Sequence, residues 1–212
     1  MQKFLDSPLG NLLRVLGDLI TVNLLFVLCS LPIVTLGASA SAMYAVLLKL
    51  VRGEHVYVIR TFFKNWKDNF LKATAIWLIF LAMAAVVYAD VLFAYTFEGN
   101  MRYTFLIVAT VVGIIALLIM TLGTLQLSNY ENTLKNYIKN SFLLAACAPG
   151  WLILAWAVWV ALVALIVLFA DYIVTYGFVI LMWGISAPAY ATAYFANKIF
   201  NKIESAQENQ IV

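Results

Sequence analysis

The chain has 212 residues, of which 65% are hydrophobic and only 11% are charged, with a formal net charge of +3. A soluble protein of this size could not bury so much apolar surface, so ordinary soluble folds are excluded. The Lys and Arg residues gather in a few clusters between long apolar runs, which is typical of a polytopic membrane protein with basic loops on one side. The positive charge is therefore assigned to loops at a membrane surface, and nucleic-acid binding is not expected.

The apolar runs determine the predicted fold class. They are about twenty residues long and do not alternate with polar residues, which favours helices over membrane strands of roughly 9–11 residues. We predict an all-α transmembrane bundle that forms a single integral membrane domain over residues 1–212. Its six predicted spans are residues 15–36, 38–51, 73–97, 103–127, 142–170 and 173–196, and the fifth is broken near Pro149 and Gly150.

The distribution of charge predicts the orientation of these spans. The basic segments are 49–72, 135–139 and the C-terminal tail, and the positive-inside rule puts all three in the cytoplasm together with the N-terminus. Gly37 then lies near the outer face. The second span, 38–51, is only about 21 Å long at 1.5 Å per residue, which is short for a hydrocarbon core of roughly 30 Å. A five-span alternative stays open, in which residues 38–51 lie in or on the inner face and the N-terminus is outside.

Residues 54–72 form the clearest amphipathic segment, and we predict a helix there in addition to the six spans. Its apolar residues recur at spacings of three and four, while its cations lie off that stripe; the stripe consists of Val56, Ile59, Phe63, Trp66 and Phe70. We predict a helix in the cytoplasmic interface, with its apolar side in lipid and its basic side toward anionic headgroups. The alternative is a docking surface for a partner protein such as an ATPase, formed by Arg60, Phe63, Lys64, Trp66 and Lys67.

Two short stretches rich in small residues and proline are candidate helix breaks or cavity linings. The first contains Pro32, Gly37, Ser39 and Ser41, and the second contains Gly184, Ser186 and Pro188. Small residues let helix backbones pack closely, whereas broken helices line the solute path of many transporters. Asp90 joins these candidates because it is an acidic group in an apolar span with no cation nearby in sequence.

The sequence contains no arrangement of residues that predicts catalysis. His55 is the only histidine, and the two cysteines, Cys29 and Cys147, lie far apart, so no metal site is expected. The chain also lacks a GxSxG elbow, a Walker A pattern and a GxGxxG fingerprint. We therefore expect a protein that is not an enzyme and that carries no cofactor.

The chain contains four short segments, Leu31–Ala38, Ser41–Tyr44, Leu50–Glu54 and Phe62–Phe70, that together resemble the YesL-like family of bacterial integral membrane proteins. This family has no established activity that could be carried over to particular residues. Its genes often accompany carbohydrate ABC importers and glycan-degrading enzymes, chiefly in Gram-positive bacteria. The resemblance implies a multi-pass protein of the bacterial cytoplasmic membrane with an accessory role in carbohydrate uptake.

Three functional hypotheses follow from these observations. The leading one is a non-catalytic accessory subunit of a carbohydrate ABC importer, surrounded by membrane lipid and in contact with the permease subunits or the ATPase. The second is a stand-alone transporter or channel for a small solute, and the third is a membrane assembly or regulatory factor. Homo-oligomer formation is compatible with all three.

Overall fold

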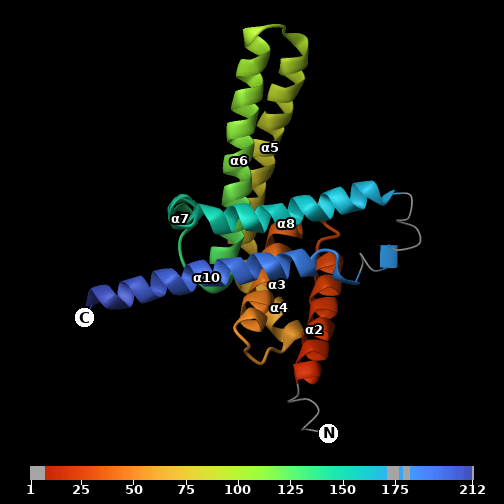
Figure 1. The fold of residues 1–212 in the computed structure, drawn as a ribbon, viewed down its shortest axis with the longest axis vertical. Coiled ribbons are helices and arrows are strands. Elements are labelled where there is room, and N and C mark those ends of the chain that lie inside the picture. The colour runs from red at the N-terminus through yellow and green to blue at the C-terminus, as the bar shows by residue number, and fades with distance from the viewer. Residues whose placement is uncertain (1–7, 171–176, 179–181, 212) are drawn as a thin grey trace.

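The computed structural model describes residues 8–170, 177–178 and 182–211. Within these ranges the chain forms α-helices and one short 3-10 helix without any strand, so the all-α prediction is confirmed. The elements, labelled in Figure 1 where there is room, are α2 (Pro8–Cys29), η1 (Ile33–Thr35), α3 (Leu36–Val51), α4 (Val58–Asp68), α5 (Phe70–Thr96), α6 (Asn100–Asn129), α7 (Leu134–Cys147), α8 (Pro149–Leu168) and α10 (Ser186–Ile211).

The most prominent feature is the long hairpin of α5 and α6, which extends from the rest of the molecule in Figure 1. The two helices have 27 and 30 residues, which gives each a length of about 40 Å or more at 1.5 Å per residue. Large apolar side chains are exposed along both helices, among them Leu78, Leu81, Val86, Leu92, Ile107, Val111, Ile114 and Leu117. Both helices are therefore long and apolar enough to cross a membrane.

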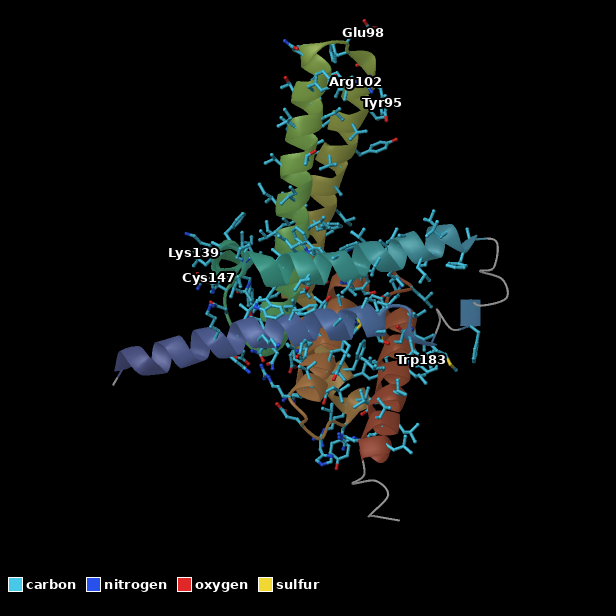
Figure 2. The ribbon with its side chains drawn as sticks, in the orientation of Figure 1. Tyr95, Glu98, Arg102, Lys139, Cys147 and Trp183 are labelled. Carbon is cyan, nitrogen blue, oxygen red and sulfur yellow. The ribbon has the colours of Figure 1, made fainter. Side chains whose placement is uncertain are left out.

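The tip of the hairpin is a tight turn at Gly99, whose φ of 65° lies in the left-handed region that favours glycine. Figure 2 shows Tyr95, Glu98 and Arg102 together at this tip, far from Lys139 on α7. The Arg102 guanidinium carbon lies 5.7 Å from the centre of the Tyr95 ring, a cation–π distance. This contact gives the cation of the turn an aromatic partner at the end of the hairpin.

Helices α3 and α4 form an antiparallel pair beneath the hairpin. The Ser41 hydroxyl near the start of α3 donates a hydrogen bond of 3.1 Å to Asn65 near the end of α4, and a short segment joins the two helices at their other ends. Val58 and Phe62 point from α4 into the core, where Phe62 is fully buried. Every residue of α3 from 37 to 48 is buried, so α3 forms the centre of the described structure.

The start of α3 lies directly against the start of α5. A Cβ added to Gly37 would clash with the carbonyl oxygen of Ala73 and would lie 2.7 Å from Cβ of Trp77. The prediction that Gly37 lies near the outer face, opposite the inner end of the span 73–97, is therefore wrong in this arrangement. The physical reason is close packing: without a side chain at Gly37, two helix backbones can approach and bury Ala73 between them.

The predicted fifth span, 142–170, is divided between two helices. Helix α7 ends at Cys147 and α8 begins at Pro149, with Ala148 between them in a non-helical conformation (φ −145°, ψ 56°). A residue before proline avoids the helical region, which places the break here. In Figure 1, α8 and α10 run across the base of the α5–α6 hairpin, and they pack against each other.

Five helical segments of the described residues are long and apolar enough to cross a membrane: Leu9–Cys29, Ile33–Val51, Phe70–Thr96, Asn100–Asn129 and Pro149–Leu168. The second is longer than the predicted span 38–51, because η1 continues directly into α3. The predicted sixth span, 173–196, lies partly outside the described residues, and its last part forms the start of α10. These apolar helices support a membrane location.

Candidate functional site

Helix α4 carries most of the predicted docking residues, and its three faces have different surroundings. Val58 and Phe62 are buried against α3 and the rest of the core. Ile59, Phe63 and Lys67 follow one another at a spacing of four and form an exposed stripe, which we call the outer stripe. The helix is therefore anchored by one face and leaves another free for contact with lipid or protein. It is also shorter than the predicted segment 54–72.

Trp66 differs from the other docking candidates because it belongs to the packing of the protein. The centre of its ring lies 4.9 Å from that of Phe70, and the side chain packs against buried residues of the core. The buried indole Nε1 has no hydrogen-bond partner among the described residues. Arg60, Phe63, Lys64 and Lys67 remain exposed, so these four are available for a partner while Trp66 supports the fold.

A polar cavity of about 670 Å³ lies beside the third face of α4. Four cations from three helices line it: Lys49 of α3, Arg60 and Lys64 of α4, and Lys72 of α5. We call these four residues and the space between them the basic cavity. The predicted docking residues Arg60 and Lys64 thus face a concave site, whereas Phe63 does not line it.

The basic cavity has an excess of positive charge. Its lining includes two carboxylates, Asp68 and Glu131, against the four cations. Among the described residues, none of the four cations makes a hydrogen bond or an ion pair. Neutral polar side chains, among them Asn69, Ser128 and Asn129, complete the wall. Such a lining suits an anion that accepts hydrogen bonds from both charged and neutral donors.

One basic residue that the sequence did not single out links three helices next to this cavity. Arg52, just after α3, donates from Nε to Oδ1 of Asn197 in α10 at 2.9 Å, and from Nη2 to Oδ1 of Asn129 in α6 at 2.9 Å. The guanidinium group thereby holds the ends of α3 and α6 together. Only its place in a basic cluster marked it in the sequence, because both partners are distant along the chain.

The first predicted break is a link between helices, followed by tight packing. Pro32 lies in the non-helical segment before η1, where the Thr35 hydroxyl donates to the carbonyl oxygen of Cys29 at 2.6 Å. Ser39 is buried, and its hydroxyl has no partner among the described residues. Gly37 contacts Ala73 of α5, and Ser41 donates a hydrogen bond to Asn65 of α4. The small residues of the first break therefore lie where α3 packs against its neighbouring helices.

The second predicted break is joined to α2 by the buried side chain of Asn23. Asn23 of α2 is fully buried, and its Oδ1 accepts hydrogen bonds from the backbone N–H groups of Ile185 at 3.2 Å and Ser186 at 2.8 Å. Asn23 thereby caps the start of α10 from another helix. Gly184 precedes this start, and Pro188 is buried in the first turn of α10.

Asp90 lies in the last third of α5, toward the tip of the α5–α6 hairpin, and is half-buried. Its Oδ2 atom is buried and has no hydrogen-bond partner among the described residues. Neither Asp90 nor any of the other seven candidate break or cavity residues lines the basic cavity or the smaller pockets around α7, α8 and the start of α4. The helices that begin at the two breaks, α3 and α10, pack against each other, whereas Asp90 lies toward the tip of the hairpin.

A buried polar cluster fixes the connection between α6 and α7. Tyr137 is 1% exposed; its hydroxyl donates to the carbonyl oxygen of Tyr130 at 2.7 Å and accepts from the N–H of Asn132 at 2.8 Å. Gln126 donates to the Ser141 hydroxyl at 3.0 Å in the same region. Burial raises the pKa of the Tyr137 phenol, although the hydrogen bond from Asn132 opposes this. The cluster has the features of a structural clamp.

Comparisons with known proteins relate one part of the chain to a described family. Residues 19–91 match a family model described as "Protein of unknown function, DUF624". No curated protein and no solved structure matches the chain. The matched segment runs from α2 at Leu19 through α3 and α4 into α5, and so contains the outer stripe, the Gly37–Ala73 contact and the four cations of the basic cavity.

Proposed function

We propose that this chain is a non-catalytic accessory subunit in the bacterial cytoplasmic membrane, where it binds the permease subunits or the ATPase of a carbohydrate ABC importer. The observation that carries the docking role is the outer stripe of α4. There, Ile59 is 58% exposed and Phe63 is 39% exposed, although both belong to a helix that the core holds in place. A rigid helix that presents an aromatic anchor loses little conformational entropy when it binds.

The charges around the outer stripe favour a protein partner with acidic groups. Arg60 and Lys67 are exposed on either side of Phe63. Cations at the rim of an apolar contact accelerate association with an acidic surface and select against basic partners. The assignment to a carbohydrate importer is supported by the resemblance of residues 31–70 to the YesL-like family, and these residues lie inside the matched family model.

The test is affinity purification of the chain from native membranes in mild detergent, followed by quantitative mass spectrometry. We expect importer subunits to purify with the wild-type chain and to fall about tenfold or more with Ile59→Ser combined with Phe63→Ser, because such a change removes the apolar anchor. Phe142→Ser is the matched control, since Phe142 is 44% exposed on α7. It should leave the complex unchanged.

Two results would contradict this proposal in different ways. An unchanged complex in the Ile59→Ser, Phe63→Ser variant would exclude the outer stripe as the docking surface. A stable complex that contains no importer subunit would exclude the importer assignment but leave the docking surface intact. Replacement of Trp66, by contrast, would disturb the packing around Phe70 and would not report on docking alone.

A stand-alone channel or transporter is the second candidate. The observation that favours it is the packing of α3 and α10, which begin at the two predicted breaks, against each other, while Asn23 of α2 holds the backbone at Ser186. Discontinuous helices that meet in this way line the solute path of many transporters. Reconstitution of the chain alone into liposomes tests it: flux of small sugars that Asn23→Ala alters would favour this candidate, and no flux across a broad panel would count against it.

A further inference from the structure

We propose that the basic cavity is a specific binding site for the phosphate group of an anionic phospholipid. The inference goes beyond the proposed function and does not depend on it, because every residue of the site belongs to this chain. It also differs from the general attraction between basic loops and a membrane. A cavity of about 670 Å³ can hold one headgroup with defined contacts.

The first argument is the convergence of uncompensated charge. Lys49, Arg60, Lys64 and Lys72 come from three helices, and none of them is paired with another described residue. Like charges that face one cavity repel each other, so the fold is more stable when an anion fills the space. A phosphodiester offers several strong acceptor oxygens, and basic pockets between membrane helices at this level bind phosphorylated headgroups.

The second argument is the position of the cavity at the base of the α5–α6 hairpin. Lys72 lies in the first turn of the candidate span Phe70–Thr96. Ser128 and Asn129 form the last residues of α6, the other helix of the hairpin. The paired ends of two spans mark the boundary of the hydrocarbon core, which is where lipid phosphates lie.

The third argument distinguishes a lipid from a free phosphate compound. A large apolar side chain lies next to one of the lining cations: Leu71, which precedes Lys72 at the start of α5, is 81% exposed. A soluble anion would gain nothing from this side chain. An acyl chain would cover it, and burial of apolar area contributes about 25 cal/mol per Å².

The two carboxylates set a limit on the ligand. Asp68 and Glu131 lie in the wall with the four cations, so the cavity retains an excess of two positive charges. That excess matches one phosphodiester or phosphomonoester group better than a polyphosphate, whose additional charge would meet the carboxylates. Phosphatidylglycerol, with one phosphodiester and an uncharged headgroup, is therefore the probe of choice.

The experiment measures lipid binding to the delipidated full-length chain in detergent by native mass spectrometry. Phosphatidylglycerol is titrated in parallel with phosphatidylcholine and with inorganic phosphate. We expect saturable binding of one phosphatidylglycerol, weakened about thirtyfold by Lys64→Gln combined with Lys72→Gln, because each lysine near an anionic headgroup contributes about fivefold in affinity. The matched control removes two exposed lysines of α7, with Lys135→Gln and Lys139→Gln, and should change binding less than about threefold.

Each remaining outcome would overturn the proposal. Equal binding of phosphatidylglycerol and phosphatidylcholine would exclude recognition of the net anionic headgroup, and equal weakening in both double variants would show only general charge attraction. Saturable binding of inorganic phosphate without binding of phosphatidylglycerol would exclude the lipid as the source of the phosphate. Lys64 and Lys72 are exposed and their replacement relieves repulsion among the cations, so the circular dichroism of the lipid-free variant should match that of the wild type and its Tm should be no lower.

Discussion

The contact between α3 and α5 at Gly37 can be tested with a single methyl group. In Gly37→Ala, the new Cβ would clash with the Ala73 carbonyl oxygen and lie 2.7 Å from Cβ of Trp77. Both obstacles are fixed, one by the backbone and the other by the root of its side chain. No rotamer change can relieve them, so the two helices must move apart.

The structure also supplies the control variants for this experiment. A Cβ at Gly17 of α2 would meet no atom within 4 Å, and a Cβ at Gly123 of α6 would meet the Cδ1 methyl of Ile76 at 3.3 Å, which can rotate away. Gly→Ala in an open helix position stabilises by about 0.5–1 kcal/mol, whereas overpacking costs about 1–3 kcal/mol. We expect Gly17→Ala to stabilise, Gly123→Ala to be near neutral, and Gly37→Ala to destabilise by about 2 kcal/mol or more.

The assay is unfolding of the detergent-solubilised chain, followed by far-UV circular dichroism during a titration with a denaturing detergent. For a chain of this length, about 2 kcal/mol corresponds to a shift in Tm of about 4–8 °C, which a thermal scan detects independently. The reasoning would be refuted if the Gly37→Ala variant proved as stable toward unfolding as the Gly17→Ala variant. In that case α3 and α5 do not touch at their starts, and the hairpin topology with Gly37 at the opposite face would be restored.

Two further predictions concern buried polar contacts. Asn23→Ala leaves the N–H groups of Ile185 and Ser186 without their acceptor and should destabilise by about 2–4 kcal/mol, measured by the same titration, whereas alanine at the exposed Asn11 should change stability little. Tyr137→Phe should destabilise by about 1–3 kcal/mol at neutral pH through loss of both hydroxyl contacts. The folded-state pKa of Tyr137 is raised above its ordinary value of about 10, so the contribution of its hydroxyl to the free energy of unfolding is complete below pH 10 and is lost as pH rises toward the folded value. Parallel stability curves of the wild type and the Tyr137→Phe variant through that range would contradict this.

The long apolar runs predicted individual helices because hydropathy and length are local properties of the chain. The sequence predicted helices over 73–97 and 103–127, and the structure contains α5 at Phe70–Thr96 and α6 at Asn100–Asn129. The break before Pro149 also had a local signal, because proline acts on its own neighbours. For α4, the sequence predicted an amphipathic helix but not which stripe would be buried, since two apolar stripes lie side by side on it.

The contacts that define the candidate sites had no local signal. Hydropathy places Gly37 in a helix but does not say that Ala73 lies against it, and topology rules assigned the two residues to opposite faces. Asn23 carried no signal of its role in the sequence, because its partners, Ile185 and Ser186, lie more than 160 residues further along the chain. Such pairings depend on how helices are arranged in space, which depends on the sum of many small contacts.

The same distinction explains why the basic cavity became visible only in the structure. In the sequence, Lys64 and Lys72 belong to one cluster that the positive-inside rule already accounts for, so nothing in the sequence indicated a binding site there. Because α4 runs antiparallel to α3, Lys64 and Lys72 line a common cavity, and Lys49 of α3 lines the same cavity. Cations that determine membrane orientation can lie anywhere on the cytoplasmic surface, whereas cations that bind a ligand must face the same cavity. Their convergence at the base of the α5–α6 hairpin gives these lysines a ligand to recognise as well as a side of the membrane to mark.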